Sequence, residues 1–369
     1  MAIRVRSRRY TSYDIHIAAD LVSSAEVSEK AGGGVDRWLD RLGLNRPWIV
    51  VSSPAIWRHW GRQLDRSFRG TTPLLIPDGE RAKHLGTVAR VYEGLLERGA
   101  RRQTPVIVIG GGVLGDLAGF AAATYFRGLP LVHVPTTLVA QVDSAIGGKV
   151  GVNLPAGKNL VGAFYPPRAV LVDPTFCSTL PTREFRSGLF EVIKYGAIGA
   201  PRLFDRLTAL PLLALQRDAR RLTPIIETCC RLKATVVTAD EQESGLRRIL
   251  NFGHTVGHAL EAVTAYRRFR HGEAVGLGML AATDISVARG LLAEDRLATL
   301  TTLVRSLGAL PKVTDLSAAD VVRAAHHDKK RTGRHLTFVL LRDIGQTVVA
   351  DEVRPGEVSQ ALRRLGLAR

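Results

Sequence analysis

The 369-residue sequence predicts an α/β domain with a mostly parallel sheet over residues 1–180, followed by a mainly helical domain over residues 181–369. Two observations support this fold class. Short apolar runs alternate with helical spacing before residue 180, whereas long amphipathic stretches dominate after it. The length also exceeds the roughly 250–300 residues at which single hydrophobic cores stop growing.

Five apolar runs in the first half have the length and the Val and Ile content of buried strands. They cover residues 47–52, 73–77, 104–109, 131–134 and 169–172. Helical spacing occupies residues 83–98 and 116–124, between these runs. Strands that alternate with helices predict a parallel sheet covered by helices.

The second half contains seven amphipathic stretches, at residues 183–198, 201–214, 221–238, 250–265, 273–289, 294–307 and 318–326. One late pair of β-type runs, at 336–341 and 346–349, flanks a polar turn at 342–345. We therefore expect helices with a single hairpin in this half.

Composition excludes several classes of protein. No run reaches the ~18 apolar residues of a membrane span, and the basic residues 1–9 lack the apolar segment of a secretory signal. Cys177, Cys229 and Cys230 have neither the number nor the spacing of a disulfide framework or zinc knuckle. We expect a cytoplasmic protein that does not bind membranes.

The formal charge of +17 would suit a nucleic-acid partner, but the basic residues are spread along the chain and aromatic residues make up only 6%. We therefore expect no nucleic-acid partner. Lysine is scarce among the 51 basic residues and concentrates in polar motifs, at Lys83, Lys149, Lys158, Lys194, Lys233, Lys329 and Lys330. A compact ammonium on a flexible stem suits an anionic ligand.

A glycine-rich turn, Gly110-Gly111-Gly112-Val113-Leu114-Gly115, follows an expected strand and opens an expected helix. This context predicts a Rossmann-like nucleotide-binding turn, with the helix N-terminus facing a pyrophosphate. No acidic residue follows at the usual distance of about 20 positions to hold a ribose. A turn required only for packing is the alternative.

Residues 134–159 carry further polar signals. Thr136 and Thr137 end a strand, where hydroxyls commonly meet a ligand in α/β sheets. Asp143 and two Gly-Lys steps, which end at Lys149 and Lys158, follow them. We predict an irregular loop that wraps an anion, with a solvated loop as the alternative.

Two helical segments in the second half suggest a metal site. Glu191 and Lys194 share a face of an apolar helix, where burial would cost several kcal/mol without compensating charge. His254 and His258 have the i, i+4 spacing of metal-binding histidines, and His271 follows closely. Two or three imidazoles with one carboxylate suit Zn²⁺ with an open position. A structural ion pair remains the alternative for Glu191, and spacing does not decide whether His258 binds metal or faces a substrate.

Together these segments resemble the 3-dehydroquinate synthase family of the sugar phosphate cyclases, over residues 48–345. The resemblance implies an NAD-binding α/β domain, a helical domain and a homodimer. It implies a phosphate-eliminating lyase of the shikimate pathway, which leads to chorismate and the aromatic amino acids. The substrate would be 3-deoxy-D-arabino-heptulosonate 7-phosphate, an anionic sugar phosphate, and the products 3-dehydroquinate and phosphate. NAD and Zn²⁺ or Co²⁺ would be the cofactors.

The resemblance also implies roles for individual residues. The metal ligands would be Glu191, His254 and His271. The NAD site would comprise Glu80, Lys83, Gly111, Gly112, Val113, Asp116, Thr136, Thr137, Asp143, Lys149, Lys158 and Thr179. The substrate would contact Lys149, Asn159, Lys194, Lys233, Arg247, Asn251, His258 and either Lys329 or Lys330, with Arg127 supplied by a second subunit.

Two related activities are alternatives. One is a cyclase that acts on sedoheptulose 7-phosphate, although Lys233, Arg247, Asn251 and His258 favour a carboxylated substrate. The other is a metal-dependent polyol or glycerol phosphate dehydrogenase, which would release NADH at each turnover. Ser53 stands where family members often carry an acidic residue for the adenosine ribose, which predicts weaker NAD⁺ binding.

Overall fold

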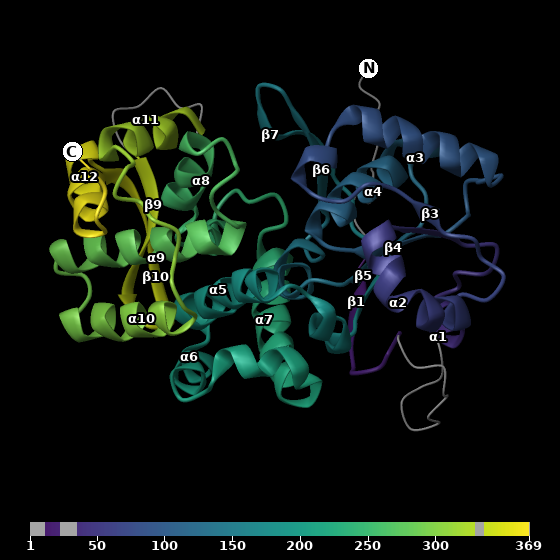
Figure 1. Ribbon diagram of the computed structural model, residues 1–369, viewed down its shortest axis with the longest axis horizontal. Helices are drawn as coiled ribbons and strands as arrows, with labels where there is room; N and C mark the ends of the chain where they lie inside the picture. The colour runs from purple at the N-terminus through teal and green to yellow at the C-terminus, as the bar shows by residue number, and fades with distance from the viewer. Residues whose placement is uncertain (1–11, 23–34, 329–335, 369) are drawn as a thin grey trace, which may run out of the picture. The chain divides into compact units, whose positions relative to one another are not determined.

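The computed structural model describes residues 12–22, 35–328 and 336–368, and the chain divides into two compact units between Thr179 and Leu180 (Figure 1). The first unit contains strands β1 (Asp14–Ile17), β2 (Ile49–Ser52), β3 (Leu74–Leu75), β4 (Val106–Gly110), β5 (Leu131–Pro135), β6 (Lys149–Leu154), β7 (Gly157–Phe164) and β8 (Ala169–Val172). Its α-helices are α1 (Val35–Arg41), α2 (Pro54–Ser67), α3 (Leu85–Glu97) and α4 (Gly112–Thr124).

Six strands of the first unit form one parallel sheet in the order β1-β8-β5-β4-β2-β3, which confirms the predicted α/β class. Strands β2, β4, β5 and β8 are buried throughout, as expected of strands covered on both faces. Strand β1 was not predicted, because it is only four residues long and partly exposed at the edge of the sheet.

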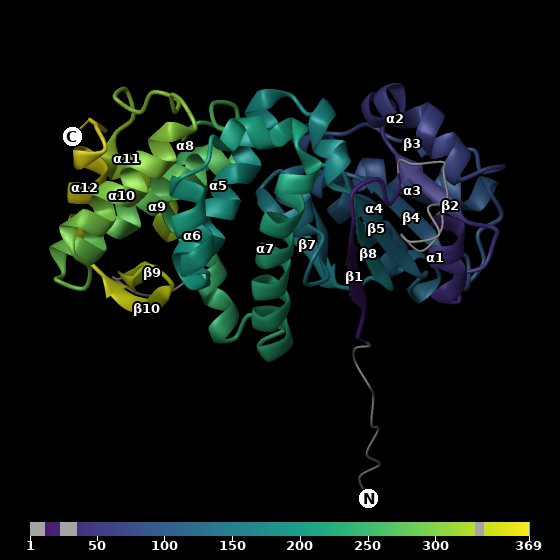
Figure 2. The ribbon, with the colours of Figure 1, turned by 90° about the horizontal axis from the view of Figure 1, so that it is seen from below.

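Alternate residues of each central strand enter opposite cores. Ile49 and Val51 pack in one cluster with residues of α3 and α4, whereas Val50 packs in the other with residues of α1 and α2. The split follows from the two-residue period of a strand. Figure 2 shows the sheet strands among these helices. The sheet therefore fixes the Gly-rich turn between β4 and α4 on a rigid base.

Strands β6 and β7 form an antiparallel hairpin, so the prediction of an irregular loop over this segment was wrong. Gly151 lies opposite Gly162 in the hairpin, and a Cβ at Gly151 would come 2.6 Å from the carbonyl oxygen of Val161. Glycine and polar residues weaken the usual sequence signal of a strand. The two Gly-Lys steps therefore lie on a defined hairpin.

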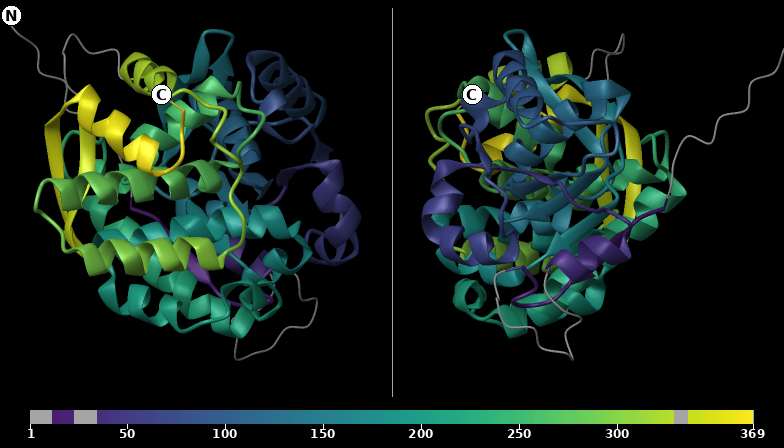
Figure 3. Two further views of the ribbon diagram at one scale, coloured as in Figure 1. Left: turned by 60° about the vertical axis from the view of Figure 1, so that its left-hand side comes forward. Right: turned by 90° about the vertical axis from the view of Figure 1, so that its right-hand side faces the viewer.

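The second unit contains helices α5 (Thr182–Gly199), α6 (Pro201–Thr208), α7 (Ala219–Ala239), α8 (His254–Val263), α9 (His271–Ala288), α10 (Glu294–Ser306), α11 (Ala318–Asp328) and α12 (Pro355–Arg364). It also contains the hairpin of β9 (Leu336–Asp343) and β10 (Gln346–Val353), drawn in yellow in Figure 3. The predicted helical character and late hairpin are confirmed. Helix α9 is buried along most of its length, and α5, α8, α10 and α12 pack against it.

One expected helix of the second unit, 250–265, is interrupted. A 3₁₀ turn, Leu246–Asn251, comes first, and α8 begins only at His254. Gly253 precedes α8 with φ +80°, a left-handed conformation that interrupts the helix. No helix among the described residues has the length and apolar character needed to cross a membrane.

Candidate metal centre and nucleotide-binding turn

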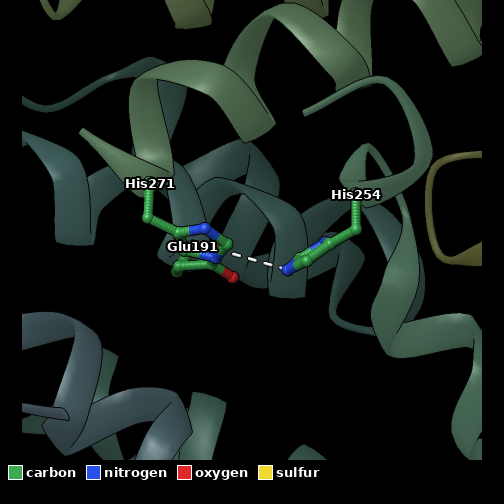
Figure 4. Close-up of side chains that lie close together, drawn as sticks. All are labelled: Glu191, His254 and His271. Carbon is green, nitrogen blue, oxygen red and sulfur yellow. Dashed lines mark ion pairs between the residues drawn. The ribbon is translucent and has the colours of Figure 1, made fainter. Parts of the chain in front are cut away.

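Three side chains from three helices of the second unit converge (Figure 4). Glu191 lies in the middle of α5, His254 is the first residue of α8, and His271 is the first residue of α9. The Oε1 atom of Glu191 lies 3.3 Å from Nε2 of His271 and 3.8 Å from Nε2 of His254. One donor atom from each residue falls within 4.8 Å of the others, a spacing that fits a single metal ion.

The carboxylate of Glu191 is fully buried, and its two oxygens have different neighbours. Nζ of Lys194 lies 2.6 Å from Oε2, while Oε1 faces the two imidazoles. The i, i+3 ion pair expected from the sequence is therefore present, and it coexists with the predicted metal set. Lys194 is 1% exposed and holds the carboxylate in one orientation.

Each imidazole has a partner for its second nitrogen. Nδ1 of His254 lies 3.1 Å from the carbonyl oxygen of Phe252, and Nδ1 of His271 lies 3.3 Å from Oε2 of Glu261. In a metal-bound site these acceptors would hold the proton of each ring on Nδ1, which leaves the Nε2 atom on the Glu191 side to bind the metal. Metal-binding histidines usually have such a partner. The sequence reading assigned no role to Glu261.

The two imidazoles have different proton affinities. Burial, followed by the charge of Lys194, lowers the pKa of His254 to about 3. Burial also acts to lower the pKa of His271, but hydrogen bonds to Glu191 and Glu261 outweigh it and raise that pKa to about 10. The neutral His254 can bind a cation directly, whereas His271 must release a proton before it binds a cation.

Glycines allow the three helices to approach closely enough for these side chains to meet. A Cβ at Gly272 would lie 1.9 Å from the carbonyl oxygen of Ser187 on α5. A Cβ at Gly253 would lie 2.7 Å from the carbonyl oxygen of Val275 on α9. The glycines beside His254 and His271 thus serve the backbone contacts that bring α8 and α5 against α9.

A second buried carboxylate, Glu273, lies two residues after His271. It accepts hydrogen bonds of 2.7–2.8 Å from Arg183 and Arg186 of α5, and its carboxylate also accepts the backbone N–H of Arg270. Burial acts to raise the pKa of Glu273, but these hydrogen bonds hold it below its usual value. Glu273 therefore ties the start of α9 to α5. The sequence reading included it in a motif without giving it this role.

The remaining expected substrate residues of the second unit occupy neighbouring elements. The His258 ring centroid lies 5.3 Å from that of His254 and 5.9 Å from that of His271. Lys233 on α7 is buried, Arg247 is buried with its guanidinium donating to the carbonyl oxygen of Glu241, and Asn251 donates to Glu243. Lys329 and Lys330 lie outside the described residues.

In the first unit, the Gly-rich turn joins β4 to α4 as predicted. Gly111 is the N-cap of α4, and a Cβ at Gly112 would come 2.7 Å from Oγ of Ser144. A side chain at residue 112 would thus displace Ser144, and the N-terminus of α4 suits an anion. Thr136 continues from β5 with its backbone N–H bonded to Gly110, and Asp143 lies in a π-helical turn, Ala140–Ser144. Such turns are frequent at functional sites.

Lys83 is almost fully buried and joins several of the predicted residues. Its ammonium lies 2.6 Å from a carboxylate oxygen of Asp116 and 2.5 Å from the amide oxygen of Asn159. Asn153, which the sequence reading missed, donates to Glu80 and accepts the backbone N–H of Asn159. The structure thus brings together predicted residues from α4, the hairpin and the turn at Glu80–Ala82.

Other predicted residues of the first unit have structural partners or exposed positions. Ser53 is buried and caps α2, with its Oγ accepting from the N–H of Ile56, and Thr179 accepts from the indole of Trp60. Arg127 is exposed beside exposed Phe126, and both have left-handed φ angles of 66° and 50°. Lys149 is exposed at the start of β6, whereas Lys158 lies 3.6 Å from Glu80.

Comparison with known proteins gives two adjoining family matches. Residues 73–187 match the family model described as 3-dehydroquinate synthase N-terminal, and residues 188–331 match the one described as 3-dehydroquinate synthase C-terminal. A 3-dehydroquinate synthase from Gloeobacter violaceus is 46% identical over 343 residues, which cover 90% of this chain and 93% of that protein.

Solved structures of sugar phosphate cyclases are similar along the whole chain. ValA, a 2-epi-5-epi-valiolone synthase from Streptomyces hygroscopicus with NAD⁺ and Zn²⁺ bound, has a TM-score of 0.87 and 30% identity and covers 98% of this chain and 99% of its own. A 2-deoxy-scyllo-inosose synthase complexed with carbaglucose-6-phosphate, NAD⁺ and Co²⁺ has a TM-score of 0.80 and 27% identity, covering 95% of this chain and 96% of its own.

Proposed function

The chain belongs to the 3-dehydroquinate synthase family, and on this basis we propose that it converts 3-deoxy-D-arabino-heptulosonate 7-phosphate to 3-dehydroquinate and phosphate. The reaction is that of a carbon–oxygen lyase. It proceeds by transient oxidation, elimination of phosphate, re-reduction and intramolecular aldol closure. The match of both halves of the chain to dehydroquinate synthase regions is the observation that carries the proposal.

The residues of the second unit fit a divalent metal. Two imidazole nitrogens and one carboxylate oxygen, from His254, His271 and Glu191, form a donor set suited to Zn²⁺ or Co²⁺ with a position left for substrate. When bound, the metal would polarise a substrate hydroxyl and NAD⁺ would accept and return a hydride. Both cofactors are present in the ValA structure.

Buried cations of the second unit support an anionic substrate. Lys194, Lys233 and Arg247 are 1–5% exposed and lie on α5, α7 and the 3₁₀ turn before α8, which pack together. Burying a cation costs several kcal/mol unless negative charge compensates it. A carboxylate and a phosphate on the substrate would supply further compensation. These cations would bind and orient the substrate, with His258 and Asn251 beside them.

The first unit would bind NAD⁺ at its Gly-rich turn. The N-terminus of α4 would face the pyrophosphate, where its unpaired backbone N–H groups and helix dipole favour negative charge. The buried ion pair of Lys83 with Asp116 would hold the hairpin through Asn159. Lys149 and Lys158 would add positive charge from the hairpin.

We further infer that the enzyme acts as a homodimer in which Arg127 reaches the site of a second copy. Phe126 is 46% exposed, Arg127 beside it is exposed too, and both have left-handed backbone angles, a strain that often marks functional segments. Sedimentation should show a dimer. Mixing Arg127→Ala with a separately inactive Lys194→Ala chain should restore part of the activity if sites are shared between subunits.

The test of the proposed function is phosphate release from 3-deoxy-D-arabino-heptulosonate 7-phosphate with NAD⁺ and Zn²⁺, with NADH absorbance followed in parallel. Stoichiometric phosphate and dehydroquinate without accumulated NADH is the expected result. Release of phosphate only from sedoheptulose 7-phosphate would move the substrate to the alternative cyclase. NADH that builds up with turnover would indicate a dehydrogenase and contradict the proposal.

A further inference from the structure

Glu261 is a buried carboxylate that the proposed reaction does not use directly. It lies on α8 seven residues after His254, so the 3.6-residue period places both on one face of the helix. The residue is 4% exposed, and Oε2 lies 3.3 Å from Nδ1 of His271 on α9. A carboxylate at this depth requires a compensating partner.

We propose that Glu261 is a positioning residue of the metal centre, which accepts the Nδ1–H of His271 and thereby directs Nε2 of that ring toward Glu191. The inference rests on the proposed function, because it takes the metal ligands from it. A charged acceptor gives a stronger hydrogen bond than a neutral carbonyl and increases the basicity of the imidazole as a ligand.

The two histidines of the site differ in this respect. His254 is oriented by a backbone carbonyl only two residues away, at Phe252, and so needs no side-chain partner. His271 begins α9 and is 35% exposed as a side chain, so local backbone does not fix its ring. Glu261 supplies the constraint from another helix. Its own backbone carbonyl is anchored by the N–H of Tyr266 and the hydroxyl of Thr264.

The competing role for Glu261 is that of a direct ligand to a second metal ion. Donor atoms of His258, Glu261 and His271 also lie within 4.8 Å of one another, as the ligands of a second metal ion would. Nδ1 of His271 and Oε2 of Glu261 already lie at hydrogen-bonding distance, 3.3 Å apart, so this contact needs no second ion between the two atoms. We therefore assign Glu261 as a hydrogen-bond acceptor and expect one ion per chain.

The experiment measures metal binding without turnover. Zn²⁺ stoichiometry and dissociation constants are obtained by competition with a chromophoric chelator, and Co²⁺ absorption reports the coordination geometry. The variants are Glu261→Ala and Glu261→Gln. The control is Asp284→Asn, which removes an arginine-paired carboxylate about 20 Å further along α9. Circular dichroism confirms that each variant is folded.

Wild type should bind one ion, and Glu261→Ala should bind one ion about 10–100-fold more weakly with a changed Co²⁺ spectrum. Glu261→Gln should recover part of the affinity, because its amide oxygen still accepts from Nδ1–H. Unchanged affinity in both Glu261 variants would overturn the inference. Two ions in wild type and one in Glu261→Ala would overturn it too, in favour of a ligand role. A wild-type chain without metal would instead contradict the metal site of the proposed function.

Discussion

Glu191 and Glu273 are both fully buried carboxylates of the second unit, yet their surroundings differ. Glu273 receives two guanidinium groups and a backbone N–H, so its charge is compensated by the protein itself. Glu191 has one ammonium on Oε2 and two imidazoles on Oε1. One of these imidazoles, His254, stays neutral because its pKa is lowered to about 3.

This difference separates a carboxylate that stabilises the fold from a carboxylate that belongs to a binding site. A carboxylate surrounded by permanent cations stabilises the fold and has no further chemistry to offer. A carboxylate that faces neutral or exchangeable imidazoles is arranged to receive an added cation. Burial alone would not distinguish Glu191 from Glu273; the identity of the partners does.

Glu191→Gln should have the largest effect. Loss of the anionic ligand should abolish stoichiometric Zn²⁺ binding and lower kcat by on the order of 10³-fold, equivalent to several kcal/mol of lost charge stabilisation. Metal content by mass spectrometry and phosphate release would be measured on the same preparation. A variant that retained one tightly bound ion per chain would show that Glu191 belongs with Glu273 as scaffold.

Glu273→Gln should lower stability and largely spare metal binding. It leaves Arg183 and Arg186 without their carboxylate, and both retain some solvent exposure, so we expect a loss of about 2–3 kcal/mol in the free energy of unfolding. Urea unfolding of the metal-free protein is the measurement. If the variant lost metal affinity to the same degree as Glu191→Gln, the two carboxylates would not have separate roles.

In the first unit, the side-chain amide of Asn153 has a similar structural role, because it holds neighbouring segments together. Asn153→Ala removes the hydrogen bond that joins the β6–β7 hairpin to Glu80 and the one that links Asn153 of β6 to Asn159 of β7, and it should weaken NAD⁺ binding by about 5–10-fold. Calorimetric titration of NAD⁺ would measure the change, with exposed Asn45→Ala as the control. Equal dissociation constants in wild type and Asn153→Ala would mean that this network does not position the cofactor site.

The strand and helix pattern was predictable because apolar runs in the first half and amphipathic stretches in the second are long and regular. The histidine spacing indicated a metal site but paired His254 with His258, whereas the structure groups His254 with His271 and Glu191. The residues alone suggested His271 and a carboxylate as further ligands, and the family resemblance implied the set of Glu191, His254 and His271.

Features that depend on contacts between distant segments were not predictable. Glu261 and Glu273 acquire their roles only when α8 and α5 pack against α9, and neither residue differs in local sequence from a solvated glutamate. The β6–β7 hairpin was missed because glycine and lysine hide its alternation. Ser53 stands at the position of the family's acidic ribose ligand, and its hydroxyl caps α2, a contact that the sequence alone did not indicate.

Asp240 is a further carboxylate whose charge the protein itself compensates, and its replacement should have the smallest effect of these variants. It ends α7 and accepts backbone N–H groups of Ser244, Gly245 and Arg247, which hold the segment that carries the expected substrate residue Arg247. The hydrogen bond from the backbone N–H of Arg247 contributes most, and together these bonds lower the pKa of Asp240 from 3.8 to about 2.

Because the folded-state pKa is depressed, the stabilisation by Asp240 is present above pH 3.8 and is lost as the pH falls toward 2. Asp240→Asn should therefore be less stable than wild type near neutral pH, and the difference should shrink below pH 3.8. Urea unfolding at a series of pH values measures it, with Asp218→Asn at the other end of α7 as a control that keeps a capping side chain. A difference independent of pH would show that the neutral amide is disfavoured by its shape, and that the charge of Asp240 does not hold the Arg247 segment in place.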